Sequence, residues 1–197
     1  MSAEERHEYF MEIALQEARE ALDAREFPVG CIAVHDDKVV ARGRRINSRN
    51  GTGSTFTGKS CYGGPCSGPQ KQARTANELD HAEINCLRQL NEFPYQVDYA
   101  QVTFYSTLEP CLMCYGALLI NGIGVIVYSY EDVMGGGTML DRSYLTPFYR
   151  NRQVEIIPFI LREKSLTLFK EFFSSPGCSY LNGTYLARYT LGMMNDK

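Results

Sequence analysis

Two short segments organise this chain: His81-Ala82-Glu83 and Pro110-Cys111-Leu112-Met113-Cys114. They read H-x-E and P-C-x-x-C, and they supply one imidazole and two thiols as ligands for a single metal ion. Zinc favours a tetrahedral set of nitrogen and sulfur ligands, and a catalytic zinc site keeps one of its four positions for water. We therefore predict a zinc site held by His81, Cys111 and Cys114.

Glu83 is the polar residue of these segments that coordination does not need. A carboxylate two residues from a zinc ligand is placed to take a proton from the water and to pass it to a leaving group. We therefore predict that Glu83 is the catalytic acid and base. The alternative is a structural zinc site, because C-x-x-C alone is common in zinc fingers and ribbons. Such sites take four protein ligands, and neither His7 nor His35 has a convincing partner in the sequence.

The residues around both motifs predict that each motif opens a helix. Residues 83–90 carry apolar side chains on one face, so a helix that starts at the first motif ends at Asn91. A second helix covers residues 111–121, with Pro110 at its first turn, where proline is tolerated, and Gly122 at its end. Its apolar residues indicate a buried element, in which Met113 is core or pocket wall rather than a ligand: Leu112, Met113, Leu118, Leu119 and Ile120.

The rest of the chain alternates helices and strands. A capping box at Ser2-Ala3-Glu4-Glu5 predicts a first helix that runs to about Ala24. Alternating β-rich residues predict a hairpin and three later strands, and a last helix follows. About two dozen residues separate the last two strands, which suits a parallel crossover and not a tight hairpin. The predicted strands cover residues 29–34, 38–42, 102–107, 125–128 and 154–157, and the last helix covers 165–173.

The chain resembles the superfamily of cytidine and deoxycytidylate deaminases, and within it the branch of the tRNA wobble adenosine deaminases. The resemblance implies a three-layer α/β/α sandwich around one mixed five-stranded sheet whose last two strands are parallel. It also implies hydrolytic deamination of an aminopyrimidine or aminopurine, and a homodimer, because members commonly pair through the zinc helices. The resemblance runs from about Arg6 to about Phe173, with a gap between Arg49 and Leu79. The matching sequence segments are residues 27–31, 81–84, 106–114, 116–117 and 123–124.

The same resemblance implies a substrate pocket beside the metal. Its walls would be Val29, Ala82, Leu108 and Pro110. In the resembled family an asparagine soon after the second strand bonds the heterocycle, and the nearest candidates here are Asn47 and, in reserve, Asn50. The family pattern of a glycine, one residue and an asparagine would instead place Arg45 at that position, so this chain departs from the pattern.

Arginines surround the predicted substrate contact, at positions 42, 44, 45 and 49. A guanidinium fork suits a phosphate of a nucleotide or of an RNA backbone, so these residues would clamp one. A solvated charged face at the end of a strand is the other interpretation. The sequence leaves both open.

Residues 43–80 are rich in glycine, serine and threonine, which is typical of a loop. The matching connection in the resembled deaminases is shorter, so we predict an insertion at about 50–79 that covers the pocket mouth or serves a partner. Within it, Cys61 and Cys66 would bind a second metal ion or would be two exposed thiols of a mobile loop. A tyrosine-rich extension at about 174–197 ends the chain, and it lacks the basic ending of bacterial tRNA deaminases.

Composition restricts the class of protein further. A chain of 197 residues is long enough for one well-cored domain, here 1–197. The sequence has neither an apolar run of about 18 residues nor a basic start followed by an apolar stretch, so we expect no membrane span and no secretory signal. Seven cysteines, an odd number, suit a reducing compartment, which predicts a cytoplasmic protein. The net charge of -3 argues against a polyanionic partner.

Three functions follow from these observations. The first is deamination of a free nucleobase, nucleoside or nucleotide, which the acidic balance and the non-basic tail favour. The second is deamination of adenosine in tRNA, which the match at Leu108-Glu109-Pro110-Cys111 and the arginines favour. The third is a zinc-stabilised binding module that keeps the fold without the chemistry.

Overall fold

One mixed five-stranded sheet forms the centre of the computed structural model, which describes residues 2–46, 77–177 and 179–193. The strand order is β2-β1-β3-β4-β5. β1 pairs antiparallel with β2 and β3, whereas β3, β4 and β5 are parallel. The predicted mixed sheet with two parallel last strands is therefore confirmed. The strands are β1 Gly30–His35, β2 Lys38–Arg44, β3 Thr103–Leu108, β4 Val125–Tyr130 and β5 Glu155–Ile157.

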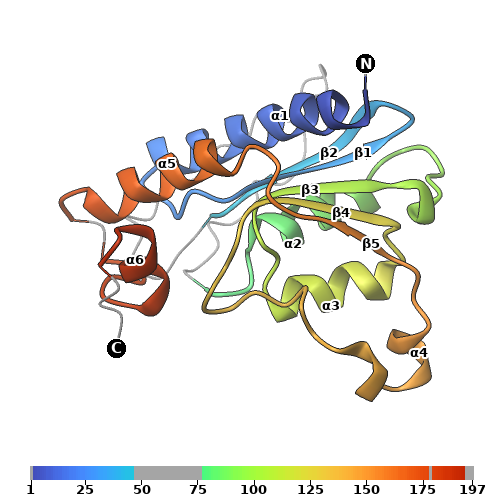
Figure 1. Cartoon of the computed structure of the whole chain (residues 1–197). Helices are drawn as coiled ribbons and strands as arrows, with labels where there is room; N and C mark the ends of the chain where they lie inside the picture. Colours follow the sequence, from blue (N-terminus) through green and yellow to red (C-terminus); the bar gives the residue numbers. More distant parts are fainter. Residues whose placement is uncertain (1, 47–76, 178, 194–197) are drawn as a thin grey trace.

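Helices cover both faces of the sheet and give three layers (Figure 1). On one face lie α1 Ala3–Asp23 and α5 Arg162–Ser174, and on the other lie α2 Ala82–Asn91 and α3 Leu112–Asn121. The predicted α/β/α sandwich is thus confirmed. Among the described residues, no helix is both long and apolar enough to cross a membrane. The short elements are η1 Tyr99–Gln101, η2 Arg142–Tyr144, α4 Pro147–Arg150 and α6 Tyr185–Thr190.

The predicted start and stop signals have clear structural counterparts. Ser2 and Glu5 form both hydrogen bonds of the capping box at the start of α1. Gly122 ends α3 in the left-handed conformation, with φ 77°. The prediction for Pro110 was wrong by two positions. Cys111 is the N-cap of α3, so the proline lies just before the helix and not in its first turn.

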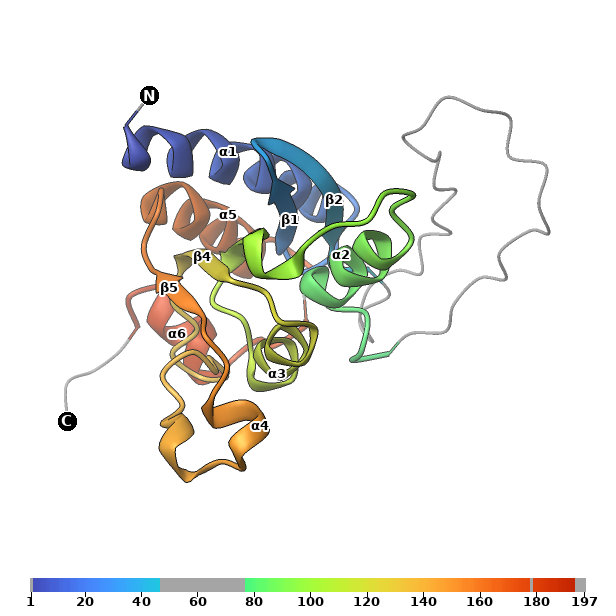
Figure 2. The same cartoon turned by 90° about the vertical axis from the view of Figure 1, so that its right-hand side faces the viewer.

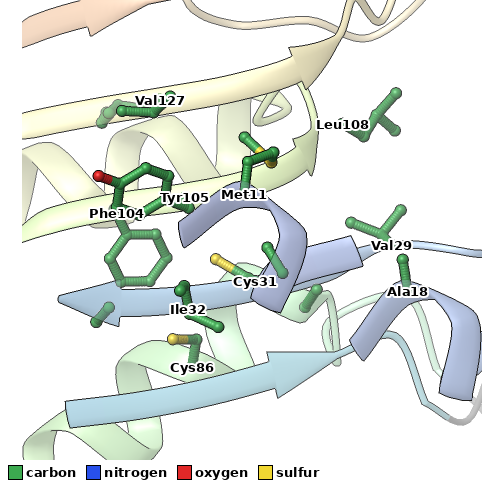
Figure 3. Close-up of a cluster of buried hydrophobic side chains, with 14 of the residues drawn as sticks. Met11, Ala18, Val29, Cys31, Ile32, Cys86, Phe104, Tyr105, Leu108 and Val127 are labelled. Atoms are coloured by element: carbon green, nitrogen blue, oxygen red, sulfur yellow. The ribbon is translucent and has the colours of Figure 1, made fainter. Parts of the chain in front are cut away.

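The main core lies between the sheet and the helix layer of α1 and α5. Figure 3 shows side chains of α1, β1, β3 and β4 that meet there. Met11, Ile32, Tyr105 and Val127 are each fully buried. Burial of side chains of this size stabilises the folded chain by about 1.5–3 kcal/mol each. This core fixes the sheet, and the sheet in turn fixes the strand ends from which the site is built.

The prediction that α3 is buried was wrong for one of its faces. Leu118 and Leu119 are buried, but Leu112 and Ile120 are 60% and 52% exposed and Met113 is 36% exposed. The sequence of α3 is apolar on every side, so its pattern does not mark which face the sheet covers. The apolar outer face of α3 is taken up again below.

α2 packs so closely on β2 that position 43 has no room for a side chain. A Cβ atom on Gly43 would lie 2.2 Å from the carbonyl oxygen of Ala82 and 2.5 Å from the backbone nitrogen of Cys86. These backbone atoms belong to the turns of α2 that carry Glu83. Glycine at this position therefore sets the distance between the sheet and the start of α2.

Gly43→Ala is expected to lower the free energy of unfolding by about 1–3 kcal/mol, because backbone atoms of α2 must move to admit the methyl group. Denaturant titration followed by circular dichroism measures this change. Gly116→Ala is the matched control, since a Cβ there meets no atom within 4 Å. Equal losses in the two variants would show that packing at position 43 does not set the stability.

Candidate metal centre

The site lies at one edge of the sheet, where several strands begin or end. The backbone N–H of Gly30, at the start of β1, donates to Thr107 Oγ1 near the end of β3 over 3.0 Å. The side chain of Asn85 donates to the carbonyls of Arg44, at the end of β2, and Asp80, over 3.0 and 3.1 Å. These bonds tie the starts of β1 and α2 to the ends of β2 and β3. Both helices that carry the motifs therefore begin at this edge.

Three predicted metal ligands meet at the starts of α2 and α3. His81 is the N-cap of α2, Cys111 is the N-cap of α3, and Cys114 lies one turn further along α3. Their ligand atoms all lie within 4.8 Å of one another. The sulfur atoms of Cys111 and Cys114 are 3.6 and 3.5 Å from Nδ1 of His81. The predicted set is therefore brought together in space.

The spacing of these atoms fits a tetrahedral zinc ion. With Zn–S bonds of about 2.3 Å and Zn–N bonds of about 2.0–2.1 Å, tetrahedral angles hold sulfur and nitrogen ligands roughly 3.5–3.6 Å apart. The two measured S···N distances, 3.6 and 3.5 Å, agree with this value. One imidazole and two thiols are also ligands that zinc prefers. The residues present thus suit zinc in both type and position.

The electrostatics of the group favour a deprotonated thiol. A hydrogen bond from Cys114, with a further one from His81, lowers the pKa of Cys111 to about 4. Burial disfavours the charged imidazole, but the contact with Cys111 and the charge of Glu83 outweigh it and raise the pKa of His81, with Arg45 opposing. Cys111 is therefore a thiolate at neutral pH, which is the form that binds metal.

Glu83 lies beside the ligands with its two carboxylate oxygens in different surroundings. Ser106 donates a hydrogen bond to Oε1 over 3.0 Å, and Oε2 lies 3.5 Å from Sγ of Cys114. The residue is 3% exposed, and burial raises the pKa of its carboxyl group. One oxygen is thus fixed to β3, and the other faces the metal ligands.

Two residues beside the ligands have roles that the sequence reasoning did not predict. Ser106, which holds Glu83, is fully buried on β3 and was not singled out. Glu109 is also buried, and its carboxylate accepts hydrogen bonds from the backbone N–H groups of Thr138 and Asp132 over 3.1 and 3.3 Å. The N–H of Gly137 in the same loop donates to Pro110 over 2.9 Å. Glu109 therefore holds the loop after β4 against the start of α3.

The other predicted residues fall into three groups. Val29, Ala82, Leu108 and Pro110 are buried at the sheet edge described above. Arg42 and Arg44 donate to the carboxylate of Glu17 on α1 over 3.2 and 2.9 Å, as a charged strand face paired with a helix would. Several predictions lie outside the described residues: Asn47, Arg49, Asn50, Cys61, Cys66 and most of the insertion at 50–79.

Neither remaining histidine lies with the metal ligands. His7 Nδ1 is 3.0 Å from the hydroxyl of Tyr105, and His35 ends β1 next to the hairpin turn. Within the described residues, the group of three ligands therefore has no fourth histidine or cysteine.

Known proteins are similar to this chain in sequence and in fold. A family model for the cytidine and deoxycytidylate deaminase zinc-binding region matches residues 4–130. A tRNA-specific adenosine deaminase of Streptococcus pyogenes is 25% identical over 169 residues, which are 86% of this chain and 91% of that protein. The matched part contains both motifs.

Solved structures are also similar to this chain. One from a study of A-to-I editing by tRNA deaminases at the wobble position of transfer RNA is 27% identical, with a TM-score of 0.59, and the match covers 81% of this chain and 98% of that one. Another, in complex with 8-azaguanine, is 18% identical with a TM-score of 0.59 over 84% of each chain, which shows the fold. Because the family model spans well over half the chain, including the three predicted zinc ligands, this chain belongs to the cytidine and deoxycytidylate deaminase zinc-binding family.

Proposed function

We propose that this chain hydrolyses the exocyclic amine of a free aminopyrimidine or aminopurine, as a base, nucleoside or nucleotide, and releases ammonia. In this proposal His81, Cys111 and Cys114 hold the zinc, and Glu83 is the catalytic acid and base. The observation that carries it is the buried carboxylate of Glu83, whose Oε2 lies 3.5 Å from the sulfur of a ligand. A purely structural zinc has no use for such a carboxylate.

Zinc, when bound to these ligands, would supply an activated water that attacks the carbon bearing the exocyclic amine, and would stabilise negative charge on the attacking oxygen. Glu83 carries out the proton transfers. Its Oε2 takes one proton from the water and gives it to the ring nitrogen, and then takes the second proton of that water and gives it to the departing amine. The carbon–nitrogen bond breaks, the carbon keeps the oxygen and ammonia leaves. Ser106 keeps Oε1 in place during these transfers. The raised pKa of Glu83 suits both roles, because an acid-base catalyst works best when its pKa is near the operating pH.

The pocket walls would come from the sheet edge next to the ligands. Val29, Ala82, Leu108 and Pro110 are buried apolar residues there, and they would exclude water from around the ring. Asn47 stays a predicted ring contact, since it lies outside the described residues.

A free substrate is supported by the charge of the chain. The net charge is -3, and two of the arginines near the predicted substrate contact, Arg42 and Arg44, are paired with Glu17. The second candidate is adenosine in tRNA, which the 25–27% identity to tRNA deaminases over most of their length favours. Ammonia release from a panel of cytosine, adenine, guanine and their nucleosides and nucleotides tests the first. Inosine formed only when tRNA is supplied would instead favour adenosine in tRNA over a free substrate.

We further propose that the protein is cytoplasmic. The cysteines of the described residues are all free thiols, which suits a reducing compartment. Glutathione-buffered lysate would then preserve its zinc content and activity.

We propose a homodimer that forms through the outer face of α3. This face exposes Leu112, Met113 and Ile120, and the helix contains no charged residue. Figure 2 shows α3 as an outer helix, next to α2 and the loop that leads to α4. An apolar face of this kind is stabilised when a second apolar surface covers it.

The double variant Leu112→Glu/Ile120→Glu is expected to be a monomer, because two charges would have to be buried in the interface. Light scattering after gel filtration measures the mass. Tyr95→Glu, at a residue that is 73% exposed in the loop after α2, is the control and should keep the wild-type mass. A dimer that survives the double change would place the interface elsewhere.

A further inference from the structure

A buried arginine lies beside the metal centre without being a zinc ligand. Arg45 follows β2, and its backbone N–H donates to the carbonyl of Val29 over 3.0 Å. Its side chain is 3% exposed. Nη2 donates to the carboxylate of Glu78 over 2.8 Å and to the carbonyl of Asn77 over 3.2 Å. A guanidinium is therefore fixed at the end of β2.

The C-terminal extension brings an aromatic ring to the same place. The hydroxyl of Tyr180 donates to the same carboxylate oxygen of Glu78 over 2.8 Å, and its ring centre is 5.7 Å from Cζ of Arg45. The ring of Phe27 packs against it at 5.5 Å. The extension itself is anchored by α6, which lies beside α5 (Figure 1) and whose Leu186 is buried. Segments from three distant parts of the sequence thus form one cluster.

This cluster borders the zinc ligands. Glu78 lies three residues before His81, and the N–H of Ile46 lies 3.5 Å from the carbonyl of Asp80, the residue directly before that ligand. Burial, with smaller effects from Glu78 and the thiolate of Cys111, raises the pKa of Tyr180 to about 12. The cluster therefore adjoins the start of α2, where the ligand His81 lies.

The chemistry of a buried guanidinium limits what it can recognise. Arg45 is paired with Glu78, but a buried ion pair is often no more stabilising than apolar residues of the same volume, so the pair points to a role beyond packing. Arginine has five N–H donors and no acceptor, and it makes its strongest bonds to oxygen. Adenine carries only nitrogen acceptors on its ring, whereas cytosine and guanine carry a carbonyl oxygen.

We propose that Arg45, oriented by Glu78 and Tyr180, binds an acceptor oxygen of the substrate, either a ring carbonyl or a phosphate. This assignment rests on the proposed function. It makes Arg45 a specificity-determining residue and Tyr180 a positioning residue contributed by the C-terminal extension. If the oxygen is a ring carbonyl, the favoured substrates are oxo-bearing bases such as cytosine or guanine, and if it is a phosphate oxygen, they are nucleotides.

The test compares Arg45→Met, which keeps the length of the side chain and removes its charge and donors, with wild type. Steady-state kinetics are measured with cytosine, cytidine, cytidine 5′-monophosphate, guanine and adenine. Titration calorimetry gives Kd for the same compounds in the Glu83→Gln background. Loss of one charge-assisted hydrogen bond is expected to raise KM and Kd of the preferred substrate about 10- to 100-fold, with a smaller change in kcat. Tyr180→Phe should also raise KM and Kd, by a smaller factor.

Zinc content and thermal unfolding show whether each variant is intact. Arg42→Met, at a side chain paired with Glu17 on α1, is the control and should leave KM unchanged. If Kd rises only for cytidine 5′-monophosphate, Arg45 binds the phosphate. If Kd rises for all oxo-bearing compounds, Arg45 binds the ring carbonyl. An unchanged Kd for intact Arg45→Met, with an active wild type, would overturn this assignment alone. A wild-type chain that releases ammonia from none of these compounds would instead overturn the proposed function.

Discussion

Glu83→Gln is expected to lower kcat by about 10²- to 10⁴-fold while the protein keeps its fold and its zinc. The amide has nearly the volume of the carboxyl group and can still accept the hydrogen bond of Ser106 at its oxygen. It cannot take up and release a proton, so the transfers to the ring nitrogen and the amine are lost. Ammonia release under saturating substrate measures kcat, and elemental analysis measures the zinc.

Glu17→Gln is the matched control, because Glu17 is also a buried glutamate, 7% exposed, but pairs with arginines of β2 on the α1 side of the sheet. Its turnover should stay near that of wild type. The same pair of variants decides between the enzyme and the zinc-stabilised binding module. A Glu83→Gln protein that keeps most of its function would support the binding module.

The sequence predicted the metal group because its signals are local. Ligand type, spacing and helix starts lie within a few residues of each other, at His81 and at Cys111 to Cys114. The parallel pairing of the last two strands followed from the length of the connection between them, which excludes a tight hairpin. These features depend on the chain near each motif, and long-range packing did not override them.

The parts that could not be predicted depend on contacts between distant segments. Nothing near Tyr180 in the sequence shows that it meets Arg45, 135 positions earlier, through a shared bond to Glu78. The same is true of Ser106 and its bond to Glu83. The exposure of Leu112 and Ile120 was missed for another reason. An entirely apolar helix carries no periodic signal to distinguish the face on the sheet from the outer face.

Cys111→Ala is expected to abolish measurable turnover and to reduce bound zinc to well below one ion per chain. Removal of one of three protein ligands leaves an imidazole and one thiol, too few to hold the ion in a site that also binds water. Zinc that binds only the folded state stabilises it, by about 2.7 kcal/mol when free zinc is 100 times its Kd. The melting temperature of wild type should therefore fall on chelation, and that of Cys111→Ala should not respond.

Cys86→Ala separates this effect from the loss of any buried thiol. Cys86 is 0% exposed on α2 and lies outside the group of three ligands. The variant should lose some stability, because a small cavity replaces the sulfur, yet keep its zinc and its response to the chelator. If both variants retained one zinc per chain, the ion would be bound by other residues and His81 with its two thiols would not be the metal centre. If both lost it equally, the loss would reflect general unfolding. Only zinc loss restricted to Cys111→Ala ties the metal to the starts of α2 and α3.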